Sequence, residues 1–117
     1  MYDTLIQIDA IEGVTVVFVG NEVDVANAET VRRYLDEAVG AQKTFVLSLE
    51  RCRYIDSTGL RPIIALAARV GSGFFVVVPR ETHIRRIFEI TGLHEKMNVC
   101  ATLDEALAGA AKMATAA

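Results

Sequence analysis

The sequence predicts a single α/β domain in which a mixed sheet of roughly four to five strands is covered by about four helices. Short apolar runs alternate along the chain with segments whose apolar residues recur at helical spacing. The 117 residues, 52% of them hydrophobic, suffice for one core and are too few for two. We therefore expect residues 1–117 to form one domain, ordered from about residue 4 to residue 113.

The first half of the chain predicts a hairpin, a helix and an inner strand. Apolar runs at residues 5–11 and 14–19 flank Glu12-Gly13, a hairpin turn signal, and we place this hairpin partly at the sheet edge. Residues 26–39 have an amphipathic pattern, which predicts a helix that begins near Asp24 or Asn27 and ends at Gly40. Residues 44–49 are apolar without interruption, so this strand is expected inside the sheet.

The second half continues the alternation. Residues 63–70 predict a helix that ends at Gly71-Ser72-Gly73, and residues 74–78 predict a strand that Pro79 closes. Thr82 is a suitable cap for a helix through Ile90, with Gly92 beyond it, and residues 98–100 form a short strand. The core stripe of that helix is expected at Ile84, Ile87, Phe88 and Ile90. Thr102 and Glu105 have capping-box spacing, which predicts a last helix from about Leu103 towards Met113 and a frayed alanine-rich tail.

Composition and charge argue against several functions. The net charge of −3 is spread along the chain, so nucleic acid is not expected as a partner. The sequence contains no run of about 18 apolar residues and no secretion signal at its start, which predicts a cytoplasmic protein without membrane insertion. Cys52 and Cys100 are interpreted as buried thiols, although a disulfide between them stays open. His83 and His94 are interpreted as surface or partly satisfied residues, and neither metal nor cofactor is expected.

The segment with the most chemical information is Tyr54-Ile55-Asp56-Ser57-Thr58-Gly59-Leu60. It lies before an apolar helix, and Ser57 or Thr58 can accept hydrogen bonds from the free N–H groups at the helix start. The helix dipole would also favour an anion there, such as a phosphoryl group on Ser57. The residues alone favour the simpler interpretation, in which Asp56, Ser57 and Thr58 form a cap cluster that has no further role.

Three motifs resemble those of the STAS domain, which occurs in bacterial anti-sigma-factor antagonists. Asp56-Ser57-Thr58-Gly59-Leu60 resembles the D-S-[ST]-G-L signature, and Glu22-Val23-Asp24 resembles the G-E-[LV]-D loop. Residues 86–93 resemble the late R-[ILV]-[FL]-x-[ILM]-[ST]-G-L segment. The likeness extends in order from roughly residue 5 to residue 107, and it implies the STAS fold.

The resemblance also implies a regulatory role in sigma factor control. In the family, an anti-sigma factor with serine-kinase activity phosphorylates the serine after the motif aspartate, and a PPM-type phosphatase reverses the reaction. The acceptor here would be Ser57, with Thr58 as the less favoured alternative. The residues that would bind the partner are Glu22, Asp24, Asp56, Thr58, Gly59, Arg61, Ile64 and Ala68. Asp24 and Asp56 are also consistent with plain capping and turn formation.

The helix after the motif has more apolar residues than it needs to cover the sheet. Ile63, Leu66, Ala67 and Val70 suffice to cover the sheet, so Ile64, Ala65 and Ala68 remain for an outer face that another protein or a second copy of the chain could cover. A homodimer therefore stays open. The alternative function is a non-switching STAS accessory or scaffold subunit of a transporter or a stress-signalling complex. An enzyme is disfavoured, because no catalytic set or glycine-rich phosphate loop is visible.

Two positions depart from the family pattern. Arg61-Pro62 follows the motif where the family has small or aliphatic residues, and Asn21 stands where the signature has glycine. Proline disfavours helical dihedrals in the residue before it, so the first turn is expected to be kinked or the regular helix to begin only at Pro62. Both changes fall on the expected partner surface.

Overall fold

The predicted hairpin is formed by β1 (Ile6–Ile11) and β2 (Val14–Val19) in a computed structural model that describes residues 5–116. The strands pair antiparallel from Ile6 opposite Val19 to Ile11 opposite Val14. Glu12 and Gly13 both have positive φ, 53° and 81°, as a two-residue turn between twisted strands requires. The hairpin prediction is confirmed, and β1 lies at the edge of the sheet.

The main sheet has the strand order β1-β2-β4-β6-β7. Its remaining strands are β4 (Phe45–Ser48), β6 (Phe74–Val77) and β7 (Asn98–Cys100), which run parallel to β2. The connections between these strands contain α1 (Ala28–Val39), α2 (Ser57–Val70), η1 (Gly71–Gly73), α3 (His83–Ile90) and η2 (Leu93–Glu95). The predicted mixed α/β sheet is therefore confirmed.

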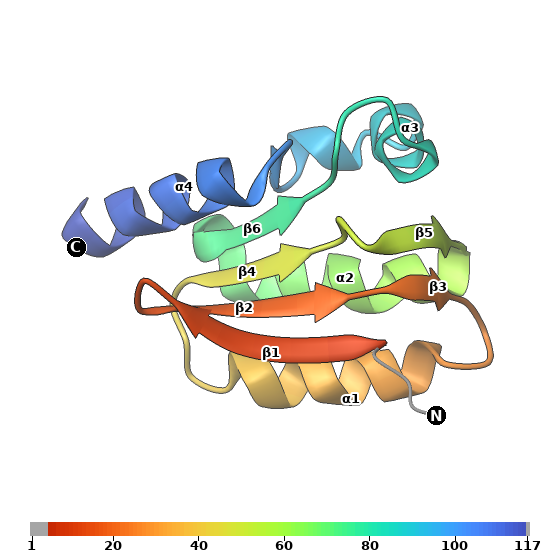
Figure 1. Ribbon diagram of the computed structural model, residues 1–117, viewed down its shortest axis with the longest axis horizontal. Coiled ribbons are helices and arrows are strands. Elements are labelled where there is room, and N and C mark those ends of the chain that lie inside the picture. The colour runs from red at the N-terminus through yellow and green to blue at the C-terminus, as the bar shows by residue number, and fades with distance from the viewer. Residues whose placement is uncertain (1–4, 117) are drawn as a thin grey trace.

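The sheet lies between two layers of helices (Figure 1). Alternate residues of the inner strands, such as Val17, Leu47 and Val76, pack towards α1 and α2, while their neighbours Val46 and Val77 pack towards α4 (Leu103–Ala116). Helix α4 continues beyond Met113, where the sequence suggested an end. None of the helices in residues 5–116 is long and apolar enough to cross a membrane.

A second, two-stranded sheet was not predicted. Strand β3 (Asn21–Val23) pairs parallel with β5 (Cys52–Ile55), and Val23 lies opposite Ile55. The interpretation of Glu22 and Val23 as part of a loop was therefore wrong. The pairing joins segments far apart in sequence, and each strand is too short to show a period of its own. This small sheet lies directly before α2 and supports the candidate site.

Two expected core residues are placed differently. Ile90 is 76% exposed, because Ile84 and Phe88 already occupy the buried face of the short helix α3. Cys52 is buried as expected, whereas Cys100 near the end of β7 is only partly buried. Both cysteines are free thiols in the structure. The expected start of order near residue 4 and the chain end at residue 117 lie outside the described residues.

Candidate functional site

The first turn of α2 is fixed by Asp56. Its extended backbone ends β5, and its carboxylate accepts a hydrogen bond from the Gly59 N–H at 3.0 Å, which makes it the N-cap. Its own N–H donates to the Val23 carbonyl at 3.2 Å, which ties the cap to the end of β3. The prediction of a strand-to-helix turn is confirmed.

The helix starts earlier than expected. It runs from Ser57 with Pro62 inside it, so the expectation of a regular helix only from Pro62 was wrong. Pro62 has no N–H to donate to the Thr58 carbonyl, and this missing bond is the local cost of the continuous helix. The Asp56 cap and the contacts of buried Leu60 and Ile63 hold the first turns in place.

The two hydroxyl residues of the turn differ in their bonding. Thr58 donates its hydroxyl proton to the Asp56 carboxylate at 2.7 Å. This bond, followed by the Gly59 N–H, lowers the pKa of Asp56 below its ordinary value. Ser57 is exposed, and within residues 5–116 its hydroxyl has no hydrogen-bond partner. Of the two hydroxyls, the one of Ser57 is therefore both exposed and without a hydrogen bond in the described residues.

Gly59 is required by close packing rather than by backbone conformation. A Cβ atom at this position would lie 2.7 Å from Val23 Cγ1 and 2.8 Å from Ile55 Cγ1. The start of α2 therefore rests directly on the end of the β3–β5 sheet. This close packing explains why residue 59 of the Asp56–Leu60 segment is a glycine.

The segment after β3 is a turn built by side chains. Asp24 accepts a hydrogen bond from the Ala26 N–H at 2.9 Å, and Asn27 accepts one from the Asp24 N–H at 3.0 Å. Asn27 also donates to the Glu22 carbonyl at 2.9 Å, so its amide serves this turn and makes no cap bond to α1. The interpretation of Asp24 as a turn former is confirmed, while Glu22 stays exposed beside it.

Asn21 explains one departure from the family pattern. Its φ is 60°, in the left-handed region that glycine favours and that asparagine tolerates better than most residues. The substitution therefore keeps the backbone conformation at the start of β3.

The outer face of α2 is apolar, as the sequence suggested. Ile64 is 42% exposed, and Ala65 and Ala68 are also exposed on this helix. Beside it, a groove of about 390 Å³ lies between α1 and α2. The groove is lined by Val25, Ala28, Glu29, Arg32, Thr58, Arg61, Pro62 and Ala65. The site therefore combines an accessible hydroxyl with a shallow apolar surface.

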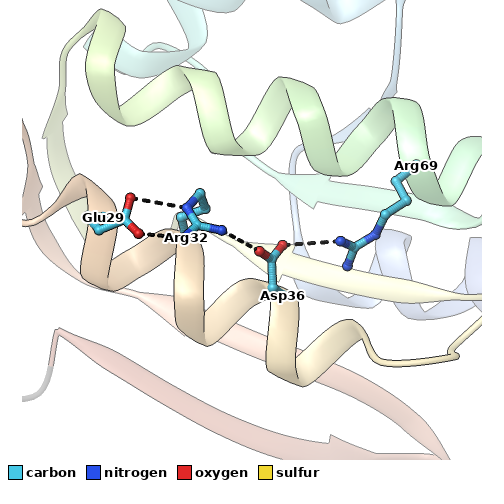
Figure 2. A network of polar contacts seen from close by, with 4 residues as sticks. All are labelled: Glu29, Arg32, Asp36 and Arg69. Atoms are coloured by element: carbon cyan, nitrogen blue, oxygen red, sulfur yellow. Dashed lines mark hydrogen bonds and ion pairs between the residues drawn. The ribbon is translucent and has the colours of Figure 1, made fainter.

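Charged side chains form a network of ion pairs between α1 and α2 (Figure 2). Arg32 pairs with Glu29 and, at 2.7 Å, with Asp36, whose second oxygen is 3.3 Å from Arg69. The pairing with Arg32 lowers the pKa of Glu29 and raises that of Arg32. Within residues 5–116, Arg61 belongs to no ion pair.

Two exposed residues were missed by the sequence interpretation. Val25 is 77% exposed in the turn before α1 and lines the groove together with the predicted Ala65. Tyr54 is 42% exposed and stacks on His83 with ring centroids 6.2 Å apart. An apolar residue inside a polar turn was the available signal for Val25, whereas nothing in the sequence placed Tyr54 beside α3. His83 and His94 are exposed, in agreement with the prediction.

The predicted site residues fall into two groups. Asp56, Ser57, Thr58 and Gly59 form the first turn of α2, and the bond from Asp56 to Val23 joins them to the strand that carries Glu22. Arg61, Ile64 and Ala68 are exposed further along the same helix. Among residues 5–116, no three histidine, cysteine or acidic side chains gather where a metal ion would bind.

Fold and site together define a small α/β domain that presents an exposed serine at the start of a capped helix. Residues 6–106 match the sequence profile of the STAS domain. An anti-sigma-F factor antagonist of Mycobacterium tuberculosis, RsfB, is 30% identical over 83% of this chain and 81% of its own length. The chain belongs to the STAS domain family, among the anti-sigma factor antagonists.

Solved structures agree with this assignment. A crystal structure of an anti-sigma factor antagonist from Mycobacterium paratuberculosis is similar with a TM-score of 0.82, at 28% identity, covering 90% of this chain and 92% of that chain. The antagonist SpoIIAA in its unphosphorylated form has a TM-score of 0.67 at 25% identity, with coverage of 87% and 92%. The STAS fold implied by the sequence resemblance is thus confirmed.

Proposed function

We propose that this chain is a phospho-switch that binds an anti-sigma factor with serine-kinase activity when Ser57 is unmodified and releases it when Ser57 is phosphorylated. The Ser57 hydroxyl oxygen attacks the γ-phosphorus of ATP, the bond to ADP breaks, and the serine proton is lost. A PPM-type phosphatase then hydrolyses the phosphoserine with water and returns the hydroxyl and inorganic phosphate. The chain is the substrate in both steps and acts in the cytoplasm.

The contrast between the two hydroxyls carries this proposal. Ser57 is exposed and unpaired within the described residues, whereas Thr58 is bound to Asp56 at 2.7 Å. Phosphorylation of Thr58 would have to break that bond and would weaken the helix cap. Phosphorylation of Ser57 breaks no hydrogen bond of its hydroxyl within residues 5–116.

The proposed binding surface surrounds this serine. It consists of the apolar face of α2 at Ile64, Ala65 and Ala68, the groove beside Thr58, and the exposed turn at Val25. A phosphoryl group adds about −1.5 to −2 charges at neutral pH. Placed within a packed contact, such a charge adds a desolvation cost and repels acidic groups such as Glu22 and Asp24. A loss of about 1.4 kcal/mol already weakens binding tenfold.

The relatives support the same role. RsfB is named an antagonist of an anti-sigma-F factor, and solved structures describe SpoIIAA in unphosphorylated and phosphorylated forms. These descriptions concern those proteins, and they make phosphorylation and anti-sigma factor binding the first properties to test in this chain.

The test is phosphorylation with a partner kinase. The chain is incubated with ATP and a candidate anti-sigma factor, and intact mass and peptide masses are measured. We expect one phosphate on Ser57 and none in Ser57→Ala, while Thr58→Val is still modified. Phosphate on Thr58 alone would contradict the switch. A partner that stays bound to the chain with and without ATP would favour an accessory or scaffold subunit instead.

A further inference from the structure

Arg61 and Ser57 share one face of α2. The helix is continuous from Ser57 to Val70, so the two residues are separated by four positions, about one turn. Residues at this spacing have Cβ atoms about 5 to 6 Å apart. Long side chains on a helix extend towards its N-terminus, which directs the Arg61 guanidinium back over the first turn. Both residues are exposed.

Arg61 is also uncommitted. Arg32 on α1 and Arg69 on α2 both pair with Asp36. Glu29 lines the same groove as Arg61 but is paired with Arg32. The Asp56 carboxylate is occupied by Thr58 and Gly59. Within residues 5–116, Arg61 belongs to no ion pair and is free to bind a new anion one turn away.

We propose that Arg61 is the intramolecular partner of phosphorylated Ser57, its guanidinium paired with the phosphate oxygens across one turn of α2. The inference rests on the proposed function, because it concerns the phosphorylated form. Arginine suits this role because its fork donates two parallel hydrogen bonds to phosphate. Asparagine, glutamine or an aliphatic residue at position 61 would leave the phosphate without this cation.

The pairing changes what phosphorylation does to the surface. The elements around this turn also carry Asp56 at the start of α2, Glu22 on β3 and Asp24 after it, Arg53 on β5, and Glu29 and Arg32, which line the same groove as Arg61. Arg61 shares the groove wall with Thr58, so its unpaired cation is part of the proposed binding surface. When the phosphate pairs with Arg61, the guanidinium is no longer available to contact the partner, so phosphorylation adds an anion and withdraws a cation from the binding surface. The switch then acts through two charges.

The test measures the phosphate itself. Phosphoserine is incorporated at position 57 during translation in the full chain, so that no kinase is needed, and the second pKa of the phosphate is followed by ³¹P NMR. A paired guanidinium favours the dianion and lowers this pKa. We expect Arg61→Gln to raise it by about half a unit and Arg61→Lys to give an intermediate value.

Arg69→Gln is the matched control. It removes an equally charged residue from the same helix, about two turns beyond Arg61 and three turns from Ser57, and should leave the phosphate pKa unchanged. Equal pKa values in the unsubstituted chain and in Arg61→Gln would overturn the inference. A lowered pKa that depends on Arg61, together with unchanged partner binding by the phosphorylated chain, would reject the proposed switch and keep the pairing.

Discussion

The hydroxyl of Thr58 donates a hydrogen bond to the carboxylate of Asp56 at 2.7 Å, and this bond separates the roles of two adjacent hydroxyl residues. Thr58 helps to hold the N-cap of α2, while the neighbouring Ser57 stays exposed. A cap cluster and a phosphate acceptor were competing interpretations of the same sequence. The two interpretations are compatible in the structure, because Asp56 and Thr58 form the cap and the hydroxyl of Ser57 takes no part in it.

The same bond predicts a pH effect. The pKa of Asp56 is lowered in the folded chain, so its cap stabilises the fold above the ordinary value of about 3.9 and is lost as pH falls through the folded value. Thr58→Val removes the largest cause, so we expect the Asp56 pKa to rise towards its ordinary value and the stability lost on acidification to become smaller.

Carboxyl NMR titration and urea unfolding between neutral and acidic pH measure both effects. Ser57→Ala is the control, because it leaves the hydrogen bonds of Asp56 in place. The same titration curve in Thr58→Val and Ser57→Ala would show that the Thr58 bond does not set this pKa.

A methyl group at position 59 should destabilise the site by overpacking. Alanine normally gains about 1 kcal/mol over glycine within a helix, yet here its Cβ would lie 2.7 Å from Val23 Cγ1. Overpacking costs about 1 to 3 kcal/mol, so we expect Gly59→Ala to lower the free energy of unfolding in urea. Adding Val23→Ala should recover part of the packing penalty, and a strictly additive double variant would argue against the contact.

The apolar face of α2 should matter for binding and little for stability. Ile64→Glu places a charge on a side chain that is 42% exposed, so the free energy of unfolding should change by less than about 0.5 kcal/mol. Affinity for the anti-sigma factor should fall about tenfold or more. Ile8→Glu is the matched control, since Ile8 is 46% exposed on the edge strand β1. Equal affinities for these two variants would place the docking surface elsewhere.

The main sheet was predictable because the pattern of apolar residues within each element indicates whether it is a strand or a helix. The apolar runs of β2, β4 and β6 and the stripes of α1 and α3 are long enough for pattern and caps to agree. The β3–β5 sheet was not predictable, because Glu22 and Tyr54 are exposed and only the pairing of distant segments makes these residues strands.

The site was predictable in its identity and less so in its geometry. The Asp56–Leu60 segment indicated the helix start. Which of the two hydroxyls donates to the Asp56 carboxylate depends on the three-dimensional geometry of the turn, and the sequence pattern does not predict it. Pro62 suggested a late helix start, yet the Asp56 cap and the burial of Leu60 outweigh the missing N–H. The exposure of Val25 also needed the fold, since it depends on the turn that Asp24 builds.

The proposed switch at Ser57 is tested by comparing the affinity of one anti-sigma factor for the chain with serine and with phosphoserine at position 57. Isothermal titration calorimetry with both forms, each checked for folding, gives this ratio. If Ser57 is the switch, phosphoserine weakens binding at least about tenfold, a loss of about 1.4 kcal/mol. Equal affinity for the two forms would contradict it.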